Sequence, residues 1–260
     1  MLSILYLMQC GGCMPLFHLL IYIAAGAVCA IIIDYLADVL PETRTLSKPV
    51  CKNCGHPFSA ADYLLARRCS HCKEKRSSKW IIYLCSMLFS AIVFLLPLAG
   101  LPLWAVIPLQ IFLGTILVID CEHRVVLIQT TLFGLILFFI YGFALNDLSA
   151  TLLGGLAGLL IMLVFYFLGI LFSKVVAIMR KKQIDEVAFG FGDVCLGTVL
   201  GLLTGWPGIA AAIIVCMFGF VTFSFIYVAV MLIFRQYRAF STTLPFTFFL
   251  VFGAMVILFL

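Results

Sequence analysis

The stretch VCLGTVLGLLTGWPGIAAAIIVCMFGFVTFSFIYVAVMLIF, residues 194–234, contains no charged side chain over 41 residues. A single α-helix of that length would be about 60 Å long, roughly twice the hydrocarbon thickness of a bilayer. Gly205-Trp206-Pro207-Gly208 interrupts the stretch with turn-forming residues and an aromatic residue suited to the membrane interface. The stretch therefore predicts two transmembrane helices joined by a turn, the first of them short.

The rest of the chain has the same apolar character. Of its 260 residues, 65% are hydrophobic and 10% are charged, against about 45–50% and about 25% in a soluble domain. Most of the further apolar runs have close to the roughly 20 residues that a helix needs to cross a bilayer. These runs occupy about 16–33, 80–97, 103–119, 125–145, 150–173 and 243–260. We expect an all-α membrane protein with about eight transmembrane helices.

The basic residues test the number of spans. With eight spans, all sixteen Lys and Arg residues fall on one side of the membrane. Loops rich in Lys and Arg stay in the cytoplasm, so we expect both termini on the outer side. The net charge of +5 is spread between apolar runs and forms no single patch. This spread of charge does not indicate nucleic acid as a partner, and the apolar composition predicts membrane lipid as one.

Three segments follow from this topology. Residues 1–33 form an N-terminal tail and the first span, and residues 80–260 form a seven-span region. Residues 34–79 form a cytoplasmic loop between them, the one loop long enough for a small domain. Cys10 and Cys13 lie in the N-terminal tail, and the sequence assigns them no role.

Four cysteines in the cytoplasmic loop have the spacing of a metal site. Two Cys-x2-Cys pairs are separated by fourteen residues: Cys51 with Cys54, and Cys69 with Cys72. Tetrahedral zinc takes four thiolates from two such turns, and Gly55 suits the first turn. Disulfides or redox chemistry are the alternatives, and a reducing cytoplasm disfavours disulfides. Four thiolates leave no open coordination position, so we expect a structural zinc in a small zinc-ribbon-like insertion.

Two carboxylates stand apart from the other acidic residues. Asp120 directly follows the apolar run that ends at Ile119, and Asp193 directly precedes the run that begins at Val194. With eight spans, both lie at the cytoplasmic membrane edge, where a carboxylate is costly to ionise and indicates function. Five other acids are assigned to the solvated loop: Asp34, Asp38, Glu42, Asp62 and Glu74.

The residues before Asp193 support a peptide substrate. Gly190 and Gly192 allow unusual backbone angles and the close approach of another backbone. If Asp120 and Asp193 meet, they cannot both ionise, and they share a proton as the acid and base of an aspartyl peptidase. The alternative is that each carboxylate caps a helix or pairs with a neighbour such as Arg124.

These motifs, in this order, make the chain similar to the type IV prepilin peptidase family, the membrane aspartyl peptidases with a Gly-x-Gly-Asp motif. The resemblance covers most of the chain from about residue 30 onward. Residues 34–41 resemble the segment before the family's cysteine loop, Ser77 stands where the family has a serine, and Leu244-Pro245-Phe246 resembles a motif of the last span. Asp120 and Asp193 correspond to the family's catalytic aspartates.

The resemblance implies an enzyme of the bacterial inner membrane. It would cleave the short basic leader from prepilins or pseudopilins, the substrates of type IV pilus and type II secretion systems, on the cytoplasmic side. Many bacterial members also N-methylate the new terminus with S-adenosylmethionine. Leu84 stands where the family has a glutamate linked to that activity, so we expect methylation to be weak or absent.

Other functions fit the same residues. One is a bifunctional peptidase and methyltransferase that retains S-adenosylmethionine as a cofactor. Another is an inactive membrane scaffold, and a third is a small transporter that uses the acids as proton carriers. A transporter places such acids near the bilayer midplane, whereas here both acids lie at one edge. The oligomeric state does not follow from the sequence.

Overall fold

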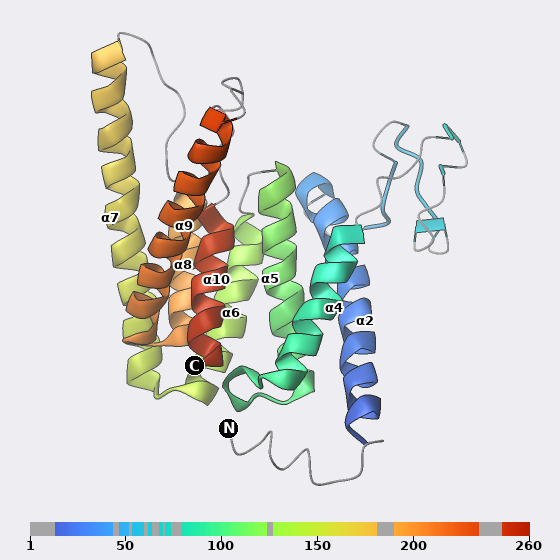
Figure 1. Ribbon diagram of the computed structural model, residues 1–260. Coiled ribbons are helices and arrows are strands. Elements are labelled where there is room, and N and C mark those ends of the chain that lie inside the picture. Colours follow the sequence, from blue (N-terminus) through green and yellow to red (C-terminus); the bar gives the residue numbers. More distant parts are fainter. Residues whose placement is uncertain are drawn as a thin grey trace. The chain divides into compact units, whose positions relative to one another are not determined.

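The computed structural model describes residues 14–43, 47–51, 54–59, 62–63, 68–69, 71–73, 80–123, 127–180, 190–233 and 246–260 (Figure 1). Cys10, Cys13, Ser77, Arg124 and the segment Leu244-Pro245 lie outside these residues. The chain forms two compact units, Met1–His123 and Arg124–Leu260.

The described part of the chain is helical. It contains α2 (Met14–Thr43), α4 (Trp80–Leu95), η1 (Leu98–Gly100), α5 (Leu103–His123), α6 (Ile128–Leu145), α7 (Leu148–Arg180), α8 (Phe191–Thr204), α9 (Gly208–Ile233) and α10 (Phe246–Phe259). Five helices are long and apolar enough to cross a membrane, namely α2, α5, α6, α7 and α9. The apolar helices α4, α8 and α10 are shorter, with 16, 14 and 14 residues. The all-α fold of a membrane protein is thus confirmed.

The break in the long apolar stretch lies where the sequence predicts it. Helix α8 ends at Thr204 and α9 begins at Gly208. Gly205 has φ +65°, a left-handed conformation that favours glycine. The amide of Trp206 donates to the carbonyl of Ala150 on α7 at 2.9 Å, which fixes the turn against the neighbouring helix.

The first helix is longer than the sequence predicts. The first span was expected to end at residue 33, but α2 continues for ten more residues and ends at Thr43. The helix persists because its next turns pack in the first unit, where Ala37 and Val39 are buried. Asp34 is only 2% exposed, so its assignment to the solvated loop was wrong. An apolar run marks the membrane span but not the end of the helix.

The first unit is held together by polar groups between its helices. α2 packs on both α4 and α5. The hydroxyl of Ser86 on α4 donates to the carbonyl of Gly26 on α2 at 2.7 Å. The buried amide of Gln110 on α5 donates to the carbonyl of Ser86 at 2.8 Å, and the hydroxyl of Ser90 donates to the Gln110 Oε1 at 3.0 Å. Interhelical hydrogen bonds of this kind stabilise helix pairs in lipid, where water offers no partner.

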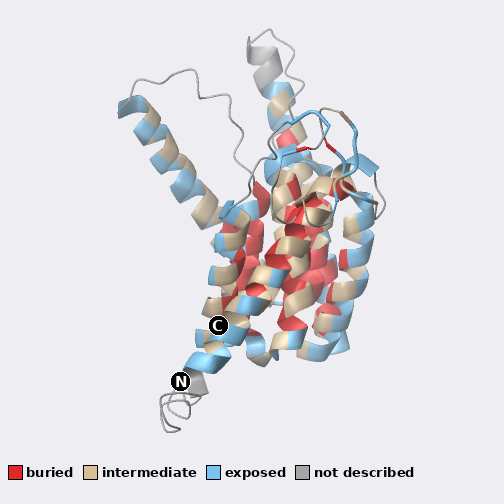
Figure 2. Cartoon of the chain, turned by 90° about the vertical axis from the view of Figure 1, so that its right-hand side faces the viewer, coloured by how far each residue is buried: buried red, intermediate tan, exposed pale blue. Residues whose placement is uncertain are grey.

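The second unit is arranged around α8. This short helix contacts α6, α7, α9 and α10, and residues 194–204 on it are buried at most positions. Figure 2 shows buried residues where helices face one another and exposed residues on the outer faces. Those outer faces are strongly apolar: Phe218 and Phe225 of α9 are 72% and 76% exposed. Lipid is the solvent that suits such a surface.

Glycines bring α7 and α8 into backbone contact. Gly154 and Gly158 on α7 face Gly201 and Gly197 on α8. A Cβ atom on Gly201 would collide with the carbonyl oxygen of Gly154, and one on Gly158 with that of Gly197. Both helices therefore carry small residues four apart, the spacing that lets transmembrane helices approach closely.

We expect Gly201→Ala to destabilise the second unit by about 1–3 kcal/mol, because the added methyl group meets backbone that cannot rotate away. Gly219→Ala is the matched control, since a Cβ there lies 3.4 Å from Phe249 Cδ1, an ordinary contact. Unfolding in mixed micelles with increasing SDS measures both variants. Equal stability of Gly201→Ala and the unmodified protein would contradict the close α7–α8 contact.

Candidate active site and metal centre

The four predicted cysteine ligands lie together. Their Sγ atoms are all within 4.8 Å of one another. Cys51 Sγ is 3.5 Å from Cys72 Sγ, and Cys54 Sγ is 3.6 Å from Cys69 Sγ. Four thiolates about 2.3 Å from one tetrahedral ion are about 3.8 Å apart. The cluster therefore has the size and the soft donor set of a tetrahedral metal site.

Two similar turns present these cysteines. In the first, the amide of Gly55 donates to the carbonyl of Cys51 at 2.8 Å, with Gly55 at φ +68°. In the second, the amide of Lys73 donates to the carbonyl of Cys69 at 2.9 Å, with Lys73 at φ 58°. Gly55 is the turn residue that the sequence indicated, whereas a lysine in the left-handed region carries no such signal.

The second turn also prepares one thiol, that of Cys69, for metal. The backbone amides of Cys72 and His71 donate to the sulfur of Cys69 and lower the pKa of its thiol to about 6. Hydrogen bonds to the charged form favour it, so the turn favours the thiolate of Cys69, whereas the pKa of the Cys54 thiol in the same cluster is raised. Metal ligands must be deprotonated before they bind. The fold thus lowers the free-energy cost of deprotonating Cys69 before a metal ion binds.

Tyr63 joins the cysteine loop to α2. Its side chain is 6% exposed, and its hydroxyl donates to Asp38 Oδ2 at 2.7 Å. The ring packs edge-on against Tyr35 and Phe58. The Tyr35 hydroxyl in turn donates to the carbonyl of Ser47 at 2.7 Å. Asp38 was expected in the solvated loop but lies in α2, and its contact with Tyr63 has no sequence signal, because neither residue belongs to a recognisable ligand pattern.

Asp193 lies in the first turn of α8, and both of its carboxylate oxygens accept hydrogen bonds. The amide of Gly190, the N-cap residue, donates to Oδ2 at 3.2 Å. The hydroxyl of Thr247 on α10 donates to Oδ1 at 3.2 Å. Capping, the alternative function for this residue, therefore accounts for one oxygen only. The other oxygen accepts from Thr247 on α10, and no pattern in the sequence around Asp193 predicts this contact.

Gly190 and Gly192 lie beside this carboxylate. Gly190 is exposed and extended, with φ −82° and ψ 153°. Gly192 is already inside the helix, since α8 begins at Phe191. The Phe191 ring packs edge-on against Tyr166 of α7, with ring centroids 6.1 Å apart. The Gly-x-Gly-Asp segment thus contains the start of α8, and Gly190, the residue directly before the helix, is accessible.

Asp120 occupies a comparable position in the first unit. It is half-buried near the end of α5, directly after the buried Ile119. The next three residues are exposed, and His123 Nε2 lies 3.9 Å from Glu122 Oε2. Asp120 and Asp193 belong to different units, so their pairing stays a prediction.

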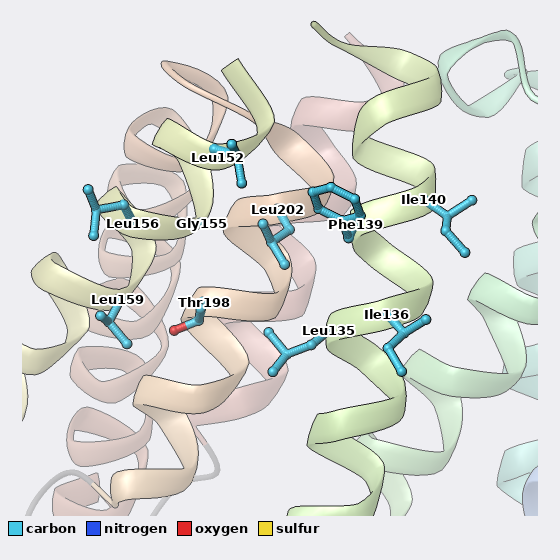
Figure 3. A pocket seen from close by; sticks show the side chains of 10 residues that line it. All are labelled: Leu135, Ile136, Phe139, Ile140, Leu152, Gly155, Leu156, Leu159, Thr198 and Leu202. Carbon is cyan, nitrogen blue, oxygen red and sulfur yellow. The ribbon is translucent and has the colours of Figure 1, made fainter. Parts of the chain in front are cut away.

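An apolar groove of about 560 Å³ lies between α6, α7 and α8 (Figure 3). Thr198 is the one hydroxyl in its lining, and that hydroxyl donates to the carbonyl of Val194 in its own helix. Thr198 follows Asp193 by five residues, which places it about 140° around the helix. The groove therefore opens away from the Asp193 carboxylate and has no group for polar chemistry.

We expect the purified protein to contain about one zinc ion per chain and Cys51→Ser to contain much less, because three thiolates and a hydroxyl bind zinc poorly. Cys85→Ser is the control, since Cys85 lies on α4 outside the cluster. Elemental analysis and thiol alkylation followed by mass spectrometry measure both. Metal-free protein in which all four thiols alkylate readily would contradict the site.

Comparison with known proteins identifies no relative: no family model matches the chain, and neither the curated proteins nor the solved structures contain a significant match.

Proposed function

We propose that the protein is a membrane aspartyl endopeptidase that removes the basic leader peptide from prepilins or pseudopilins at the cytoplasmic membrane face. The observation that carries the proposal is the Asp193 carboxylate, which accepts hydrogen bonds through both oxygens at the start of the largely buried helix α8, next to the accessible Gly190. A carboxylate in a lipid-facing bundle is costly to keep and indicates function.

Asp120 is the proposed partner of Asp193. It lies in the last turn of a second apolar helix, α5, and is likewise half-buried. Two close carboxylates share one proton. The ionised one takes a proton from water as the water oxygen attacks the scissile carbonyl carbon. The protonated one then donates its proton to the amide nitrogen as the carbon–nitrogen bond breaks.

The proposal includes the eight-span topology. The three short helices have 14 to 16 residues and cross the membrane beside longer neighbours, with both termini on the outer side of the bacterial inner membrane. This arrangement leaves every Lys and Arg in the cytoplasm. Reporter fusions at positions 60, 122, 180 and 237 are expected to give cytoplasmic signals. A periplasmic signal at any of these four positions contradicts eight spans.

The metal centre has a structural role in this proposal. A zinc ion closed by four cysteines has no position for substrate, and Tyr63 links the loop to α2 in the same unit as Asp120. The exposed Leu84 on α4 replaces the glutamate that the resemblance links to methylation. We therefore propose cleavage without methylation of the product, and no requirement for S-adenosylmethionine.

We expect Asp120→Asn and Asp193→Asn each to abolish nearly all prepilin cleavage, because the amide keeps its size but cannot exchange the shared proton. The double variant is expected to be scarcely worse, since residues that act as a unit are not additive. Glu122→Gln is the matched control, a change two residues from Asp120 at an exposed carboxylate. Cleavage in detergent or membranes, at equal protein levels and zinc contents, measures all four variants.

Substantial cleavage by Asp193→Asn would rule out the aspartyl mechanism. If the unmodified protein cleaves no prepilin, then the scaffold and transporter functions replace the peptidase. Proton flux in proteoliposomes separates these two, because only a transporter loses flux when Asp120 or Asp193 is changed to Asn.

A further inference from the structure

Thr247 differs from three other helical threonines in where its hydroxyl donates. The hydroxyls of Thr115, Thr198 and Thr204 each bond to the carbonyl four residues earlier in their own helix, at 2.7 to 3.0 Å. Thr247 is 1% exposed and is the second residue of α10. Its hydroxyl donates to Oδ1 of Asp193, 54 residues away in sequence. A buried hydroxyl needs a partner, and here that partner is a carboxylate on another helix.

The two donors to Asp193 act on its protonation state as well as its orientation. The hydroxyl of Thr247 meets Oδ1, and the amide of Gly190 meets Oδ2. Hydrogen bonds donated to a carboxylate favour the ionised form, because protonation of either oxygen removes an acceptor site. Such bonds are stronger than those between neutral groups, especially where water is scarce.

We propose that Thr247 is a positioning residue that holds Asp193 ionised and oriented, so that Asp193 is the base of the aspartate pair and Asp120 carries the shared proton. The assignment of base and acid rests on the proposed peptidase function. The action of Thr247 on Asp193 is independent of that function, because it follows from contacts within the second unit.

The helices packed against α8 bring few competing charges to Asp193. α10 contains no titratable side chain, and α6 contains only Tyr141. α9 contains Cys216, which lies within electrostatic range of Asp193, and Tyr227. α7 contains Tyr166, Lys174 and Arg180, and Tyr166 packs against Phe191. Lys174 lies eight residues beyond Tyr166, about 12 Å along the helix, whereas the Thr247 hydroxyl donates directly to Oδ1.

The test uses Thr247→Val, which removes the hydroxyl and keeps the shape, and Thr247→Ser, which restores the hydroxyl. Thr204→Val is the control, because the Thr204 hydroxyl bonds within α8 at the far end of the helix. The probe is dicyclohexylcarbodiimide, which enters membranes and adds to protonated carboxyl groups but not to carboxylates. Mass spectrometry of the N-acylurea adducts gives the labelling rates of Asp193 and Asp120 in the same sample.

We expect Asp120 to label faster than Asp193 in the unmodified protein. In Thr247→Val the rate at Asp193 is expected to rise about tenfold, with no change at Asp120, since a lost charged hydrogen bond shifts the protonation equilibrium by about that factor. Thr247→Ser and Thr204→Val are expected to label like the unmodified protein. Prepilin cleavage by Thr247→Val is expected to show a kcat about tenfold lower with KM unchanged.

Each outcome decides a different claim. Unchanged labelling of Asp193 in folded Thr247→Val overturns the action of Thr247. Faster labelling of Asp193 than of Asp120 in the unmodified protein overturns the assignment of base and acid. The expected labelling without any prepilin cleavage leaves the action of Thr247 intact and contradicts the peptidase function. If Thr247→Val does not fold, Thr247→Ala provides the same comparison with Thr247→Ser.

Discussion

The backbone contact between α7 and α8 is the interaction on which the second unit depends. α8 has only 14 residues and begins with the segment that carries Asp193, so its depth and rotation come from its neighbours. Glycines on both helices remove the side chains between them, and the backbones approach closely where Gly197 and Gly201 of α8 face Gly158 and Gly154 of α7. In lipid no hydrophobic force draws helices together, and close packing takes its place. The position of Asp193 therefore depends on the packing of α8, to which glycines without any reactive group contribute.

A second constraint acts on polar groups inside the helical units, because a polar side chain there is stabilised by a hydrogen-bond partner within the protein. Gln110 on α5 satisfies it with Ser86 and Ser90, both on α4. Asp193 satisfies it with Gly190 and Thr247 between α8 and α10. Because hydrocarbon offers no substitute for a lost partner, these bonds fix which faces of the helices meet. The same bonds that stabilise the units thereby also orient the candidate catalytic group.

The sequence predicted what depends on local composition. Apolar runs located the helices, Gly205 and Pro207 located the break, and the cysteine spacing located a cluster of four thiols that could hold a metal ion. The sequence did not predict contacts between residues that are far apart in the chain. Thr247 meets Asp193 across 54 residues without any pattern that marks the pair. The end of α2 was also missed, because burial against neighbouring helices extends it past the apolar run, through charged residues that a span excludes.

The central claim is that Asp120 and Asp193 share one catalytic water. The most direct measurement is the separation of their carboxylate oxygens in an experimental structure of the protein in lipid nanodiscs, with and without a prepilin peptide. The account predicts oxygens about 3 to 6 Å apart, close enough to share a proton or to bind one water. A separation above about 10 Å in both states would contradict the account, because no single water could then contact both groups.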